Sequence, residues 1–191
     1  QYTLIDLLNR FAKAKTICFD AVYVHLIEKY YLTGQAFWLN PNDETGKKEL
    51  KKLTDAAQRL KPILCGAYAY NFNLKDAAGQ RHELRKIEAE RTLLIFWSAD
   101  CHKCESFMKE LETIAELCQQ KDVRIVTIDN GQNMELWKQK VEKHAVLKML
   151  ALTSSTNEEL RDLIDHYDLY ETPTVFLLDK NKQISFFCGT G

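Results

Sequence analysis

Two cysteines three residues apart form the most reactive arrangement in this sequence. Cys101 and Cys104 frame the motif Cys-His-Lys-Cys, and no other two cysteines lie so close together. The pair follows the apolar run Leu93 to Trp97 and precedes a segment of helical periodicity. A thiol at the start of a helix faces unpaired backbone N–H groups and the positive end of the helix dipole, so its pKa falls. The spacing therefore indicates a thiol pair that forms and breaks a disulfide.

The residues around the pair carry charge that bears on its reactivity. His102 and Lys103 are expected to stabilise a thiolate at Cys101, whereas Asp100 opposes it. A helix that happens to bury two cysteines is the alternative interpretation. We favour the redox interpretation because a strand, a tight turn and a helix start coincide here. No metal site is expected, since the chain has neither a second CxxC nor an HxxxH.

A second informative feature is Thr172-Pro173, which precedes an apolar run at residues 175–178. Because proline cannot donate a hydrogen bond to a sheet, it marks the point where a strand begins. The sequence therefore predicts a strand that enters the sheet directly after Pro173.

Composition limits the classes of partner. The chain has 191 residues, 46% of them hydrophobic, and its 26 basic and 27 acidic side chains give a net charge of −1. This balance offers no electrostatic basis for binding nucleic acid or an anionic membrane. No apolar run approaches the roughly 20 residues that cross a bilayer. The start at Gln1 and the end at Gly191 both read as cut points, with the C-terminal end apparently truncated.

The pattern of apolar residues divides the chain into two parts. Residues 1–66 are predicted to be a helical region, and residues 67–191 alternate between strands and helices. Predicted helices cover residues 2–11, 21–30, 47–60, 102–119, 132–144 and 156–165. Predicted strands cover residues 72–74, 82–84, 92–97, 123–128, 147–152, 174–178 and 184–187. The fold class is therefore α/β, with a mixed sheet flanked by helices and preceded by a small helical region.

The apolar periodicity of the helix after the cysteines predicts which of its sides is buried. This side carries Phe107, Leu111, Ile114 and Cys118. Cys118 lies too far along this helix to reach the active pair, which makes it a core cysteine. Cys18 and Cys65 both belong to the first part of the chain and are left open as a candidate disulfide.

Several segments together resemble the thioredoxin superfamily. They are the runs 71–80, 96–104, 167–170 and 172–179. The resemblance spans about residues 68–191 and is greatest to the TlpA/ResA-like branch of extracytoplasmic thiol–disulfide oxidoreductases. The helical region is similar to the one that precedes the thioredoxin-like domain in such proteins of Bacteroidetes-type bacteria. The residues that carry that second likeness lie at 30–32, 37–39 and 60–64.

The resemblance implies a function and a set of roles. Cys101 would be the attacking cysteine and Cys104 the resolving one, with Trp97 close to the chemistry. Thr172-Pro173 would be cis and lie beside the disulfide, so that Thr172 offers its backbone to an extended substrate. No cofactor is implied beyond a redox-active Cys101–Cys104 disulfide.

The family also implies partners and a compartment. The partners would be disulfide-bearing protein substrates, which the protein reduces or isomerises, and a thiol electron donor. The compartment would be the periplasm or cell envelope, with a lipid anchor upstream as one arrangement. A non-catalytic binding module or a copper-handling protein is the alternative function.

The sequence departs from the family where a proton acceptor is expected. Thioredoxins have a buried aspartate at the position of Ile95, and ResA-like proteins have a glutamate at the position of Phe107. His102 and Glu105 are the candidates to take over this role. Asp100 stands where thioredoxins have tryptophan, which makes the expected substrate surface more polar.

Overall fold

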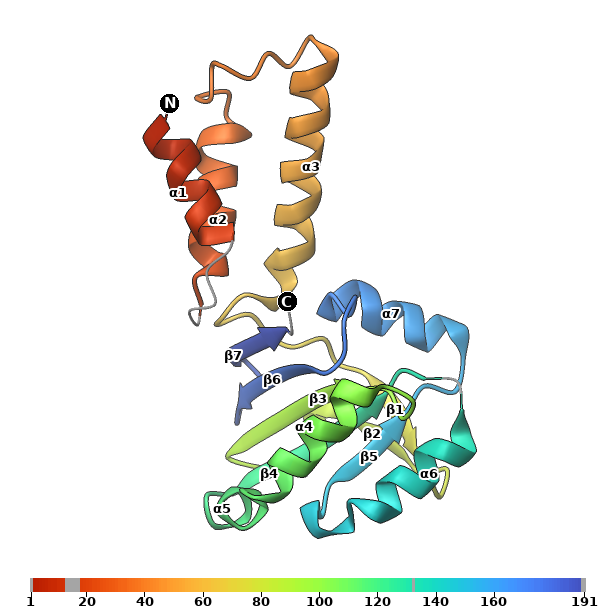
Figure 1. Ribbon diagram of the computed structural model, residues 1–191. Coiled ribbons are helices and arrows are strands. Elements are labelled where there is room, and N and C mark those ends of the chain that lie inside the picture. The colour runs from red at the N-terminus through yellow and green to blue at the C-terminus, as the bar shows by residue number, and fades with distance from the viewer. Residues whose placement is uncertain (1, 13–17, 132, 190–191) are drawn as a thin grey trace.

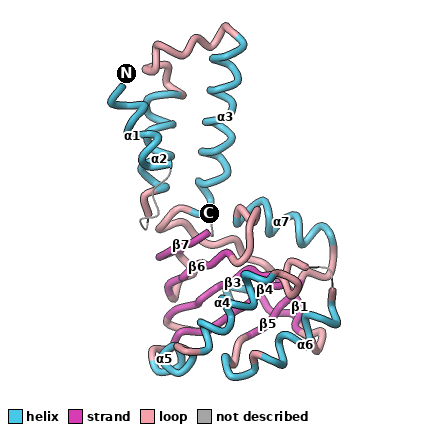
Figure 2. The backbone as a smooth tube through the Cα atoms, in the orientation of Figure 1, coloured by secondary structure: helices cyan, strands magenta, loops and turns pink. Residues whose placement is uncertain are grey.

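A computed structural model describes residues 2–12, 18–131 and 133–189 of the chain (Figure 1). The helical region stands to one side of a mixed α/β part, and Figure 2 shows the strands gathered in the latter. Among the described helices, none has the length and apolar character needed to cross a membrane.

The helical region is built from short amphipathic helices. These are α1 (Tyr2–Ala12), α2 (Asp20–Leu26), a π-helical turn (Ile27–Tyr31), α3 (Glu44–Leu60) and a 3₁₀ turn (Lys61–Ile63). Asp43 begins α3 because its side chain accepts a hydrogen bond from Gly46 N at 2.7 Å. A Cβ at Gly46 would lie 1.9 Å from Asn40 O, so this close approach requires glycine. Leu8, Ile27 and Leu53 belong to the small core that joins the helices.

The sheet has seven strands in the order β2-β1-β5-β4-β3-β6-β7. Their bounds are β1 (Asn73–Asp76), β2 (Arg81–Glu83), β3 (Arg91–Trp97), β4 (Val123–Asp129), β5 (Leu150–Thr153), β6 (Thr174–Asp179) and β7 (Ile184–Gly189). The central strand β3 pairs in parallel with β4 and antiparallel with β6. The predicted mixed sheet is therefore confirmed.

Helices cover both faces of this sheet. They are α4 (His102–Glu112), α5 (Ala115–Gln120), α6 (Met134–Lys143) and α7 (Asn157–Tyr167). Leu94 and Phe96 of β3 point into a core shared with α7, whereas Ile95 and Trp97 point into a core shared with α4, α5 and α6. This alternation explains why β3 is apolar from Leu93 to Trp97, since both of its faces are covered there.

Two element predictions need correction. The single helix expected over 102–119 is broken at Thr113 and Ile114, where the Thr113 hydroxyl donates to Glu110 O. The break turns Ile114 outward, to 45% exposure, whereas Phe107 within α4 is half-buried and packs against the core. Met108 and Ala115 take the expected places beside Leu111 and Cys118 in the core.

The second correction concerns the strand expected over 147–152. Residues 145–147 form a 3₁₀ turn that ends at Lys148 with φ +47°, so the strand starts only at Leu150. The predicted start of the α6 helix at Gln132 lies outside the described residues.

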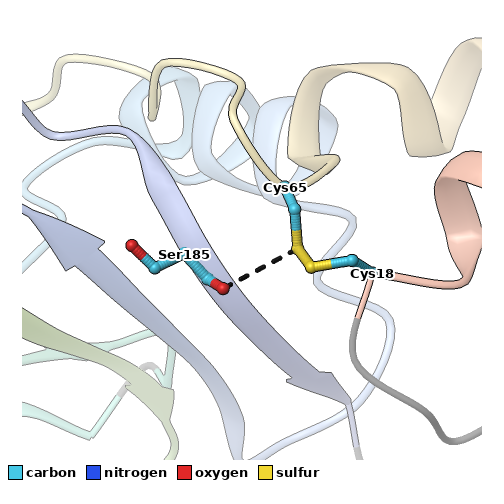
Figure 3. Close-up of a disulfide and its surroundings, with 3 residues drawn as sticks. All are labelled: Cys18, Cys65 and Ser185. Atoms are coloured by element: carbon cyan, nitrogen blue, oxygen red, sulfur yellow. Dashed lines mark hydrogen bonds between the residues drawn. A yellow bond between two sulfur atoms is a disulfide. The ribbon is translucent and has the colours of Figure 1, made fainter.

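A disulfide joins the segment before α2 to the segment that follows α3 and its 3₁₀ turn. Cys18 precedes α2 and bonds to Cys65, 47 residues further along (Figure 3). Cys65 Sγ lies 3.8 Å from Ser185 O in β7. Gly66 N donates to Ile184 O, and Ile184 N donates to Ala67 O, each at 2.8 Å. The pairing that the sequence left open therefore forms, and the hydrogen bonds beside it attach the helical region to the sheet.

Candidate functional site

The two cysteines of the motif lie at the point where β3 passes into α4. Cys101 is the N-cap residue of α4, and its Sγ accepts a hydrogen bond from Cys104 N at 3.2 Å. Cys101 is partly exposed, whereas Cys104 is completely buried, and both are free thiols. One sulfur thus faces solvent and the other lies beneath it.

The environment of Cys101 favours its thiolate. Burial acts to raise its pKa, but hydrogen bonds from the Cys104 and Thr172 side chains and the backbone of Cys104 and Lys103 outweigh this, so the pKa is lowered. The charges of His102 and Lys103 remain predicted contributors, and the contact found with these two residues is that of the Lys103 backbone. Both side chains point to solvent, and Lys103 acts through its backbone.

Cys104 is held in the opposite state. Burial, followed by the neighbouring Cys101 sulfur, raises the pKa of Cys104 to about 12. The pair therefore divides into one thiol that ionises readily and one that stays protonated at neutral pH. Such a division suits an attacking and a resolving cysteine.

The loop from α7 to β6 lies across from the cysteines. Its Thr172–Pro173 peptide bond is cis, and Cys101 Sγ donates to Thr172 O at 3.6 Å. β6 begins directly after the proline, at Thr174, so the predicted strand entry is confirmed. The structure thus brings together two segments that lie 71 residues apart in the sequence.

Trp97 and Asp100 flank the pair in different ways. Trp97 is buried in the same core as Cys104, and its indole N–H has no hydrogen-bond partner among the described residues. Asp100 accepts a short hydrogen bond from the Ser98 hydroxyl, which lowers the pKa of Asp100. Asp100 is therefore charged at neutral pH.

Glu105 is engaged by cations and is a poor proton acceptor. Its carboxylate pairs with Lys140 at 2.6 Å and with Lys143, and these two hydrogen bonds lower the pKa of Glu105 to about 2. His144 Nε2 lies 3.6 Å away, and its other ring nitrogen is 2.7 Å from Glu112. Glu105 thus anchors the first turns of α4 to α6, and the suggestion that it accepts the proton of Cys104 loses support.

A buried carboxyl near the site escaped the sequence reasoning. Asp129 is the last residue of β4, opposite Trp97, and is only 2% exposed. Its carboxylate accepts a hydrogen bond from Ala99 N at 3.1 Å, in the turn that leads to Cys101. Burial raises the pKa of Asp129 to about 6, although the N–H groups of Ala99 and Gly131 oppose this. The sequence feature that could have identified Asp129 is its position as an acidic residue at the end of an apolar central strand.

We expect Asp129→Asn to change how stability depends on pH. Because the pKa of Asp129 is about 6 in the folded chain and about 3.9 when unfolded, the folded state binds more protons between these values. Wild-type stability therefore falls as pH rises through this window, and the variant avoids this loss. From pH 4 to pH 7 the variant should gain on the order of 2 kcal/mol relative to wild type.

Urea unfolding of both proteins at the two pH values measures this difference. Asp165→Asn, at an exposed aspartate, supplies the matched control for the loss of a carboxylate. If the stability difference between Asp129→Asn and wild type were the same at both pH values, the raised pKa of Asp129 would be contradicted.

Comparison with known proteins agrees with this architecture. A thioredoxin-like family model matches residues 90–184, about half of the chain. The thiol-disulfide oxidoreductase ResA of Halalkalibacterium halodurans is 28% identical over 120 residues, which cover 62% of this chain and 65% of the relative. ResA of Geobacillus thermodenitrificans is 28% identical over 123 residues, covering 64% and 67%. The chain thus spans about two thirds of the curated relatives it matches.

Solved structures extend the match to the helical region. A thioredoxin-like protein from Bacteroides caccae superimposes with a TM-score of 0.68 at 21% identity, covering 88% of this chain and 57% of that one. This coverage exceeds what residues 67–191 alone supply, so the shared fold includes part of the helical region. A domain of a possible thiol-disulfide isomerase from Cytophaga hutchinsonii gives a TM-score of 0.58 at 27% identity, over 66% of this chain and 84% of that domain.

The fold and the paired cysteines define a thioredoxin-like protein. The family model and the ResA relatives together support a TlpA/ResA-like member of the thioredoxin superfamily. The predicted family and fold are therefore confirmed.

Proposed function

We propose that this protein is a thiol–disulfide oxidoreductase that reduces or isomerises disulfides of protein substrates outside the cytoplasm. The observation that supports this best is the division between the two thiols, one partly exposed with a lowered pKa and the other buried with a raised pKa. A disulfide in the helical region is consistent with an oxidising compartment.

In the proposed reaction the exposed sulfur attacks first and the buried sulfur second. The Cys101 thiolate attacks one sulfur of a substrate disulfide, a mixed disulfide forms, and the substrate's other sulfur leaves as a thiolate that takes up a proton. Cys104 then loses its proton and attacks Cys101 Sγ, which releases the second substrate thiol. The substrate gains two electrons and two protons, and Cys101–Cys104 becomes a disulfide. A dithiol donor protein would restore the reduced pair.

Each neighbouring group has a place in this scheme. The Thr172 side chain and the backbone of Lys103 and Cys104 hold the Cys101 thiolate before attack. Thr172 would present its backbone to an extended substrate beside the sulfurs. Glu105, tied to Lys140, keeps the first turns of α4 in place during the exchange.

Reduction of insulin disulfides tests the proposal. We expect the wild type to catalyse reduction with dithiothreitol as donor, and Cys101→Ala to fall to the uncatalysed rate, because no other described thiol is both free and partly exposed. The activity should decrease as pH falls through the pKa of Cys101, since only the thiolate attacks.

An inactive wild type would overturn the proposal, provided that an alkylating reagent also fails to reach Cys101. Titration of the reduced protein with Cu(I) examines the rival copper-handling function in the same preparation. Tight copper binding with no reductase activity would favour that rival.

A further inference from the structure

A groove lies between the helical region and the α/β part. Helix α3 forms one wall, and the C-terminal part of α7 with the loop that follows it forms the other. Figure 1 shows the end of α7 beside the lower end of α3. The groove has a volume of about 880 Å³, within the range of sites that bind small molecules or short peptide segments. We call it the α3–α7 groove.

One wall of the α3–α7 groove is basic. Lys48, Lys51 and Lys52 are spaced to share one face of α3, and all three are exposed. Within the described part of the chain none of them forms an ion pair. Arg59 adds a fourth basic side chain to the lining, against the three acidic side chains of Asp55, Asp165 and Asp168, so the groove carries one net positive charge.

The end of the groove next to the sheet carries an exposed aromatic ring. Tyr170 is 70% exposed, and the Arg59 guanidinium lies 5.4 Å from its ring centroid. Arg59 is itself fixed by Asp168, at 3.1 Å. This arrangement holds a flat apolar surface open to solvent, which is typical of a contact site for a partner.

The groove leads toward the cysteines. Tyr170 comes two residues before Thr172, and two residues of chain span at most about 7 Å. Thr172 O lies 3.6 Å from Cys101 Sγ. A substrate segment of a few extended residues can therefore reach from the attacked sulfur past Tyr170 into the groove.

The helical region is held firmly enough to serve as a wall. The Cys18–Cys65 disulfide closes its base, and Gly66 is hydrogen-bonded to β7. A wall that is fixed before binding loses little entropy when a partner docks.

We propose that the α3–α7 groove binds an acidic segment of the disulfide-bearing protein substrate, a few residues from the cysteine that Cys101 attacks. This inference rests on the proposed function and names the class of substrate. The lysines of α3 pair with the carboxylates, and Tyr170 packs against the intervening backbone.

Two model substrates test the groove. Both are peptides with one internal disulfide, identical except that one carries four aspartates a few residues from a cysteine and the other carries four asparagines at the same positions. For the wild type, we expect kcat/KM to be about tenfold higher for the acidic peptide, mainly through KM. The ratio should fall as salt is added, because exposed charges are screened.

Charge reversal locates the effect. In K48E/K51E/K52E the ratio should fall to one or below. K109E/K121E/K180E changes the net charge equally, at exposed lysines outside the groove, and should keep the wild-type ratio. Circular dichroism verifies that both variants are folded, and the salt titration of the wild type needs no variant at all.

Two results would overturn the groove assignment. One is a wild type that reduces both peptides equally well, and the other is a control variant that loses the preference as fully as the groove variant. Reduction of a small aromatic disulfide by the wild type distinguishes a failure of the groove assignment from a failure of the proposed function. Activity there without acidic preference rejects only the groove, whereas no activity, together with a Cys101 that an alkylating reagent cannot reach, rejects the oxidoreductase.

Discussion

Replacing Cys104 with serine is expected to stop the reaction at the mixed disulfide. Cys101 remains at the helix start and still attacks, but no second sulfur is left to release the substrate. Turnover should fall to the uncatalysed rate, while one equivalent of substrate becomes bound covalently to Cys101. Intact-protein mass spectrometry with a peptide disulfide measures the adduct.

The reason lies in how the two thiols influence each other. In the reduced pair, burial and the nearby Cys101 sulfur both raise the pKa of Cys104. When Cys101 enters a mixed disulfide it no longer carries a thiolate, so the second of these causes is removed. Cys104 thus becomes a better nucleophile at the step where it is needed.

Cys118→Ser is the matched control for this variant. Cys118 is also a buried free thiol in the same core, but it lies on α5, beyond the break after α4. It should keep turnover and form no adduct. Continued turnover by the Cys104 variant would show that Cys104 is not the resolving cysteine.

Removing the disulfide of the helical region should produce the largest loss of stability. Cys18 and Cys65 are separated by 47 residues, and closing a loop of that length is worth about 4 kcal/mol in the chain-entropy model. For a chain of this size the double variant Cys18→Ala/Cys65→Ala should unfold roughly 10 °C below the wild type. Differential scanning calorimetry, with circular dichroism to follow the helices, measures the shift.

Two further samples make this test specific. A single Cys65→Ala variant should unfold near the double variant, because either substitution opens the loop. Wild type treated with a phosphine reductant should approach the same temperature. If all samples unfolded together with the untreated wild type, the bond would contribute nothing to stability.

Local patterns were sufficient to predict most of the fold. The apolar run of β3, the turn and the start of α4 are neighbours in sequence, so their order alone placed Cys101 and Cys104 at a helix start. Strand entry after Pro173 was likewise a local property, because proline lacks an N–H group.

Long-range contacts could not be read in the same way. Asp129 meets the turn before Cys101 only because β4 pairs in parallel register with β3, which places it opposite Trp97. Glu105 meets Lys140 and Lys143 only because α4 and α6 cover the same face of the sheet. The hydrogen bonds to Cys101 from the Cys104 and Thr172 side chains and from the backbone also depend on orientation, which residue types do not specify.

The contact between the end of the helical region and β7 has a consequence for how copies of this protein meet. β7 is the last strand of the sheet, and a free strand edge invites pairing with another chain. Here Gly66 and Ala67 occupy the hydrogen-bonding groups of Ile184 on that edge, and Tyr68 bridges to Gln183. At the opposite edge, β2 has only three residues. The segment that tethers the helical region thus also shields the start of β7 from edge-to-edge aggregation.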